Sequence, residues 1–108
     1  MKMKTDQNAY WLHSETLVRQ LVSDTFEVLE QYGLFKPEQN KELAHDLLYR
    51  LCAVLDGSSY PGTLADKEIA PFVGFYSTDG TESVLIPDED GSGVRAFVGE
   101  MIEAYERD

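Results

Sequence analysis

The first long pattern of apolar and polar positions runs from about residue 8 to residue 32 and has the period of an α-helix. Its apolar side chains fall on one stripe when the chain is laid out at about 100° per residue. They are Trp11, Val18, Leu21, Val22, Val28, Leu29 and Tyr32. Asn8 is suited to cap this helix, and Gly33 can adopt the left-handed conformation that ends it. Phe26 lies off the centre of the stripe, which suggests a second contact.

A second helix is predicted over residues 37–55. Pro37 suits the first helical position, and Glu38 is favourable in the first turn because it faces the positive end of the helix dipole. The apolar stripe consists of Leu43, Ala44, Leu47, Leu48, Leu51, Val54 and Leu55. Only a few residues join the two helices, so we expect an antiparallel helical hairpin.

Two strand-like runs follow, over residues 72–78 and 81–86, separated by Asp79-Gly80. This dipeptide favours a type I′ turn and therefore a β-hairpin. The register that such a turn imposes pairs Val73 with Ile86 and Phe75 with Val84, which makes one face apolar. The opposite face would carry Phe72, Gly74, Tyr76, Ser83 and Leu85.

A third amphipathic helix is predicted from about residue 93. Its apolar positions recur at helical spacing and are Val94, Phe97, Val98, Met101, Ile102 and Tyr105. The fold class is therefore α+β, with an antiparallel two-helix hairpin, a small antiparallel sheet and a C-terminal helix in the order ααββα. The small sheet could gain a short strand from residues 63–70. Residues 1–108 suit a single globular domain, with residues 1–7 as a flexible N-terminus.

Acidic residues are concentrated in the second half of the chain. Residues 1–50 hold eight acidic and six basic side chains, whereas residues 51–108 hold twelve and three, within a net charge of −11. Direct binding to nucleic acid or to an anionic membrane is disfavoured, because both select basic surfaces.

The single cysteine, Cys52, cannot form an internal disulfide, and the first residues lack the apolar stretch of a secretory signal. A cytoplasmic location is the simplest expectation.

Residues 88–93 resemble the first half of an EF-hand calcium loop. Asp88, Asp90 and Ser92 would take ligand positions and Gly93 the sharp turn. The bidentate glutamate expected at the end of such a loop is replaced by Gly99. The alternative is that Ser92 caps the third helix, beside acids that favour its positive end. A Ca²⁺-responsive module is therefore one hypothesis for this chain, although we predict no metal or cofactor.

Residues 56–62 form a turn-rich loop that suggests a second hypothesis, a small enzyme or ligand-binding domain. His45 is the candidate base, but it precedes Asp56 by about 16 Å of helix, and no nucleophile is matched to it. His45, Tyr49 and Cys52 share one edge of the second helix. Zinc would need further ligands, so Cys52 is interpreted as a buried apolar side chain and His45 as a residue at the boundary of the core.

The outer hairpin face suggests a protein-binding surface. Aromatic anchors supply affinity, and rim charges of one sign speed the encounter with a partner of opposite charge. The candidate partner-binding residues are Phe72, Tyr76, Leu85, Asp79, Glu82, Asp88, Glu89, Asp90, Glu100 and Glu103. Alternatively, the 58–71 segment covers the aromatic residues and leaves no such surface.

The leading hypothesis is a non-enzymatic module that binds a basic protein partner, in the manner of an immunity protein or a mimic of nucleic-acid charge. Homodimerisation stays open, because three amphipathic helices can leave part of a stripe unburied.

Overall fold

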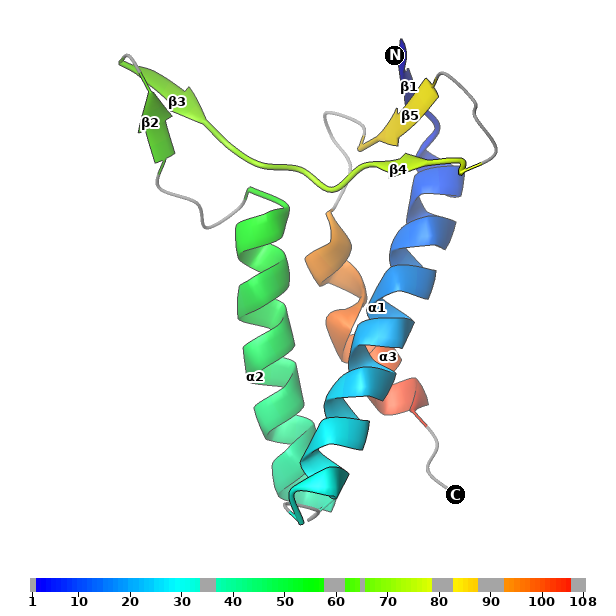
Figure 1. Cartoon of the computed structure of the whole chain (residues 1–108), viewed down its shortest axis with the longest axis vertical. Helices are drawn as coiled ribbons and strands as arrows, with labels where there is room; N and C mark the ends of the chain where they lie inside the picture. Colours follow the sequence, from blue (N-terminus) through cyan, green and yellow to red (C-terminus); the bar gives the residue numbers. More distant parts are fainter. Residues whose placement is uncertain are drawn as a thin grey trace.

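A computed structural model describes residues 2–33, 37–57, 62–64, 66–78, 83–87 and 93–105 of the chain. Two long helices, α1 (Gln7–Gln31) and α2 (Pro37–Leu55), form an antiparallel hairpin, as predicted. A 3₁₀ turn, η1 (Val94–Phe97), leads into the short helix α3 (Val98–Ala104), which passes behind α1 in the view of Figure 1. Small strands lie at the end of the hairpin where α1 begins and α2 ends (Figure 1). The α+β class is confirmed.

Helix α1 begins at Gln7, and its cap is Asp6, two residues before the predicted cap Asn8. Asp6 has an extended backbone, and its carboxylate accepts a hydrogen bond of 3.2 Å from the backbone N–H of Ala9. Both residue types are good caps, so the choice depends on where the preceding chain turns into the helix. Gly33 has a φ of +70°, which confirms the predicted left-handed end.

The N-terminal segment forms a strand that the sequence analysis did not predict. Residues 1–7 were expected to be flexible, but β1 (Lys2–Thr5) pairs in parallel with β5 (Ser83–Ile86), with Met3 opposite Val84. A parallel pair forms between distant segments, so neither segment alone carries a signal for it. The sheet is consequently mixed rather than antiparallel, with the order β1-β5-β4.

The register between β4 (Phe75–Tyr76) and β5 differs by one residue from the predicted one. Phe75 lies opposite Leu85 and Tyr76 opposite Val84. The predicted pairing of Phe75 with Val84 is therefore wrong, and the same shift excludes the pairing of Val73 with Ile86. A two-residue turn at Asp79 and Gly80 would require Phe75 to lie opposite Val84 instead. Both of these turn residues lie outside the described residues.

A separate two-stranded hairpin follows α2. Its strands are β2 (Gly62–Leu64) and β3 (Lys67–Ile69), which pair antiparallel with each other and not with the three-stranded sheet. The region left open as a source of one further strand for the sheet thus forms a hairpin of its own. Asp66, between the two strands, has a φ of +65°, a conformation that short polar side chains tolerate.

The hydrophobic core lies between α1, α2 and the η1–α3 segment. Its buried members are Val18, Val22, Phe26, Ala44, Leu48, Cys52, Val94, Val98, Met101 and Ile102. The predicted stripe of the third helix is confirmed, since it supplies four of these residues and Phe97 and Tyr105 pack against them. No helix in the described part of the chain is long and apolar enough to span a bilayer.

The stripes of α1 and α2 are only partly buried. Phe26, predicted to be off-centre, is in the core and stacks on Tyr105 with ring centroids 4.6 Å apart. Several residues predicted to be core side chains are instead exposed. These are Trp11, Val28, Tyr32, Leu43, Leu47, Leu51, Val54 and Leu55. The reason is that η1 and α3 are short and cover one side of the helical hairpin only.

Candidate functional site

The aromatic residues predicted to bind a partner are exposed around β4. Tyr76 is 66% exposed and Phe72 is 49% exposed. A Cβ atom at Gly74 would lie 3.6 Å from the ring of Phe72 and 3.0 Å from Val84, the residue opposite Tyr76, so Phe72 and Tyr76 lie on the same side of this segment. We call the pair the Phe72–Tyr76 surface. Both side chains are accessible. This counts against the alternative that the 58–71 segment covers them.

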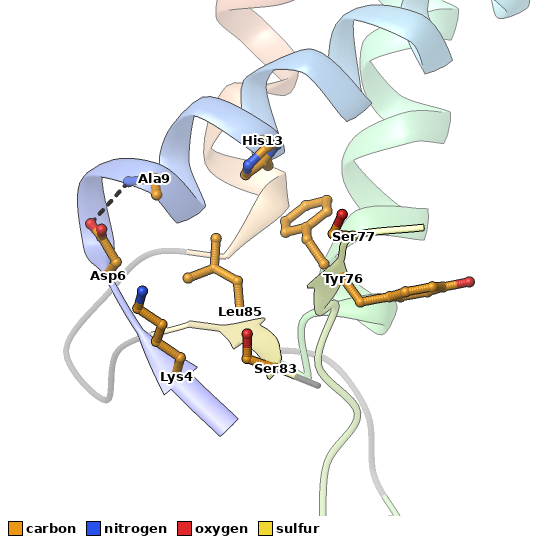
Figure 2. Close-up of a pocket in the computed structure, with 9 residues that line it drawn as sticks. Lys4, Asp6, Ala9, His13, Tyr76, Ser77, Ser83 and Leu85 are labelled. Carbon is orange, nitrogen blue, oxygen red and sulfur yellow. Dashed lines mark hydrogen bonds between the residues drawn. The ribbon is translucent and has the colours of Figure 1, made fainter. Parts of the chain in front are cut away.

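Leu85 does not belong to this surface. The observed register places Leu85 opposite Phe75, so the two share the face of the sheet turned toward α1. Figure 2 shows Leu85 pointing toward His13 and Ala9, whereas Tyr76 points away from them. A one-residue change of register moves a side chain to the other face of a strand, which accounts for the misplaced leucine.

The acidic residues of the predicted surface are only partly placed. Asp79, Glu82, Asp88, Glu89 and Asp90 lie outside the described residues, as do Ser92 and the rest of the candidate calcium loop before Gly93. Gly93 occupies the N-cap position of η1 without a side-chain hydrogen bond.

The two acids of α3 are exposed, and Glu103 lies 3.9 Å from the ammonium of Lys41. They are not beside β4. Phe75 packs on Tyr10 near the start of α1, whereas Tyr105 packs on Phe26, about 24 Å further along that helix. The structure therefore does not bring Glu100 and Glu103 together with the Phe72–Tyr76 surface.

Buried contacts with α1 hold the chain around β4 in place. The hydroxyl of Tyr10 donates a 2.7 Å hydrogen bond to the carbonyl of Val73, and its ring meets Phe75 edge-on at 5.3 Å. Burial raises the pKa of Tyr10; a hydrogen bond with Ser14 acts in the opposite direction, and the charge of Asp56 raises it further. The protonated hydroxyl is thus the favoured form, as this donated hydrogen bond requires.

A cavity of about 450 Å³ opens between the start of α1 and the sheet (Figure 2). It is lined by Lys4, Asp6, Ala9, His13, Phe75, Tyr76, Ser77, Ser83 and Leu85. Its volume falls within the range of small-molecule pockets. Its two charged side chains have opposite signs, and Asp6 is engaged as the helix cap. No cluster of His, Cys, Asp and Glu suited to a metal ion occurs among the described residues.

Asp56, at the described start of the loop proposed for an enzyme, does not meet the candidate base His45. His45 stacks on Tyr49 with ring centroids 5.7 Å apart, on a continuous helix that separates it from Asp56 by about 16 Å. Asp56 is nearly buried and lies 3.6 Å from Arg95. Ser58 and Ser59 lie outside the described residues.

Cys52 is fully buried, as interpreted from the sequence. Burial raises the pKa of its thiol, and the nearby charge of Asp56 adds to this shift. The thiol, not the nucleophilic thiolate, is therefore the favoured form.

A second exposed surface lies on the helical hairpin, where the sequence had left open that part of an apolar stripe stays unburied. On α2, Leu43, Leu47, Leu51 and Val54 are each between 43% and 51% exposed. On α1, Val28 is half exposed and Tyr32 mostly exposed. A groove of about 280 Å³ between the helices is lined by Asp24, Thr25, Val28, Leu29 and Leu47. The sequence indicates this surface through the combined width of the apolar stripes of α1 and α2, which exceeds what one short third helix can cover.

Comparisons with known proteins find no relative of this chain. No protein-family model, no curated protein and no solved structure matches it. The two exposed surfaces described above are therefore the features of the molecule that bear on its function.

Proposed function

We propose that this protein is a non-enzymatic binding module whose Phe72–Tyr76 surface engages a basic protein partner. The supporting observation is the exposure of two large aromatic side chains on a segment that Tyr10 anchors to α1. Interface hot spots are enriched in tyrosine, because it combines a large contact area with few rotatable bonds. A rigid support lowers the entropy lost when such a side chain is immobilised by a partner.

Charge favours a basic partner over an acidic or neutral one. The net charge is −11, and the sequence carries Asp79 and Glu82 between β4 and β5 and three further acids at positions 88–90. Opposite charge raises association rates, and this effect weakens as salt screens it. A partner of this kind includes the toxins neutralised by immunity proteins and the proteins that bind nucleic acid.

The cavity beside Tyr76 offers a place for an anchoring side chain of the partner. It contains the apolar side chains of Phe75 and Leu85 together with polar groups from Ser77 and Ser83. Partner side chains that carry most of the binding energy fill pockets of this kind, surrounded by contacts that exclude water. Tyr76 also lines the cavity, while its ring points outward, where it would contact the surface of the partner around such a side chain (Figure 2).

The test is a low-salt capture experiment with the full chain, followed by identification of retained proteins by mass spectrometry and measurement of their affinity. The variants are Phe72→Ala, Tyr76→Ala and, as a matched control, Leu12→Ala, since Leu12 is exposed on α1. We expect a partner of high isoelectric point whose affinity falls about 30-fold in Tyr76→Ala, equivalent to about 2 kcal/mol.

Two further results are expected for that partner. Leu12→Ala should retain it as the wild type does, and a rise in salt should slow its association. A partner bound equally well by the wild type and by a combined Phe72→Ala and Tyr76→Ala variant would show that the proposed surface is wrong. An acidic partner, or one whose binding does not respond to salt, would refute the charge argument.

A further inference from the structure

The apolar side chains left exposed on the helical hairpin form two parallel stripes. On α2 the exposed stripe is Leu43, Leu47, Leu51 and Val54, and on α1 it is Val28 and Tyr32, continued toward the start of the helix by the partly buried Leu21 and Thr25. In each helix these positions recur at intervals of three or four residues over about three turns, so they share one side of the helix. The stripes meet where Val28, Leu29 and Leu47 line one groove. We call this surface the α1–α2 face.

The α1–α2 face is turned away from α3. On α2, Lys41 reaches Glu103 and the ring of His45 lies against Gly99, and these positions lie about 125° and 165° around the helix from the centre of the leucine stripe. On α1, Phe26 meets Tyr105 on the corresponding side. The η1–α3 segment thus closes one side of the hairpin, and within the described part of the chain no third layer covers the opposite side.

Apart from Asp24, the acids of the two helices are placed away from this face. Glu15, Glu27, Glu30, Glu38, Glu42 and Asp46 all lie more than about 90° around their helices from the stripe centres. Two charges stand at its edges, Asp24 on α1 and Arg50 on α2. A strongly acidic protein repels a second copy in general, but this face can approach another without bringing carboxylates together. A basic partner, in contrast, would find few acids around it.

We propose that the α1–α2 face binds a second copy of this chain and forms a two-fold symmetric four-helix dimer. With α1 of one copy against α2 of the other, all neighbouring helices are antiparallel, as in up-and-down bundles. Asp24 lines the same groove as Leu47, and Arg50 follows Leu47 by about 4.5 Å along α2. Asp24 of one copy and Arg50 of the other therefore lie at similar heights and have opposite charge.

The available area approaches that of a stable dimer interface. α2 has 19 residues, so the hairpin offers a face about 28 Å long and about 20 Å wide, or about 560 Å² in projection. The accessible area of a ridged helical surface exceeds its projection. A stable interface takes about 800 Å² from each partner, and here it would be mostly apolar, as homodimer interfaces are.

The test is sedimentation equilibrium of the full chain, with Leu47→Asp as the interface variant and Leu12→Asp as the matched control. Leu12 is 65% exposed and lies about 170° around α1 from its stripe. We expect a wild-type mass of twice 12.2 kDa. Leu47→Asp should raise the dissociation constant at least about 100-fold, because a two-fold interface contains each substitution twice. Leu12→Asp should dimerise as the wild type does.

Two results would overturn the proposal. One is a wild-type chain that stays monomeric up to about 1 mM, where even a dissociation constant of that size gives a populated dimer; this includes the case in which the face binds a basic amphipathic helix instead. The other is a Leu47→Asp dimer as stable as that of the wild type.

If Leu47→Asp fails to fold, hydrogen exchange of the wild type tests whether the α1–α2 face forms the interface. On concentrating the protein, amides in residues 21–32 and 43–54 should gain protection, and protection confined to other segments would refute the assignment. Because Phe72 and Tyr76 lie outside the α1–α2 face, failure of the dimer leaves the proposed function unaffected.

Discussion

Replacing Gly57 with alanine tests how closely the end of α2 packs against the segment that leads to the Phe72–Tyr76 surface. Gly57 has a φ of +83°, and a Cβ atom there would lie 2.7 Å from the backbone oxygen of Pro71 and 2.9 Å from the Cβ of Ala70. Gly33 provides a matched control, because it has a φ of +70° and a Cβ at that position would meet nothing within 4 Å. The two substitutions therefore share the backbone strain and differ in the steric contact.

The expected destabilisation can be separated into these two contributions. A left-handed alanine costs about 1–2 kcal/mol at either position. The overlap at Gly57 involves backbone, which cannot rotate away, and overpacking of this kind adds about 1–3 kcal/mol. The reduced entropy of the unfolded chain favours both variants equally and cancels in the comparison. Gly57→Ala should therefore destabilise the protein by about 1–3 kcal/mol more than Gly33→Ala.

Urea unfolding followed by circular dichroism measures this difference, with all chains at one protein concentration so that any dimerisation affects them alike. The denaturant dependence should be the same for the three proteins, so that the midpoints report stability. Equal destabilisation in Gly57→Ala and Gly33→Ala would refute the reasoning, since the close approach of Pro71 to Gly57 would then contribute nothing to the fold.

Two further predictions concern the helix cap and alkaline pH. Asp6→Ala should lower the unfolding free energy by about 1 kcal/mol through loss of the N-cap, whereas Asn8→Ala should change it little, and the reverse order in urea unfolding would contradict the assigned cap. Because the folded protein raises the pKa of Cys52 and Tyr10 above their ordinary values of 9.0 and 10.0, the unfolded chain loses these protons first, and stability should decline as pH rises past those values. Cys52→Ala should make this decline shallower in unfolding experiments across pH, and an unchanged slope would show that the thiol does not contribute.

The helices could be predicted from the sequence because their signals are local. The bounds of α2 match the prediction, Gly33 ends α1 in the expected conformation, and the spacing of Val94, Val98 and Met101 identified the buried side of η1 and α3. Each of these features depends on residues within a few turns of one another. Phe72 and Tyr76 were identified from alternation along one strand, a local pattern as well, and their role in binding a partner stays a prediction.

Tertiary structure decided which part of each apolar stripe became core and how the strands paired. Leu47 and Leu48 are equally apolar neighbours, yet Leu48 is buried and Leu47 is half exposed, because the η1–α3 segment packs on one side of the hairpin only. The pairing of β1 with β5 and the opposition of Phe75 to Leu85 likewise join segments that lie apart in the chain. A side chain's hydrophobicity and spacing are properties of the sequence, whereas its burial depends on which distant segment covers it.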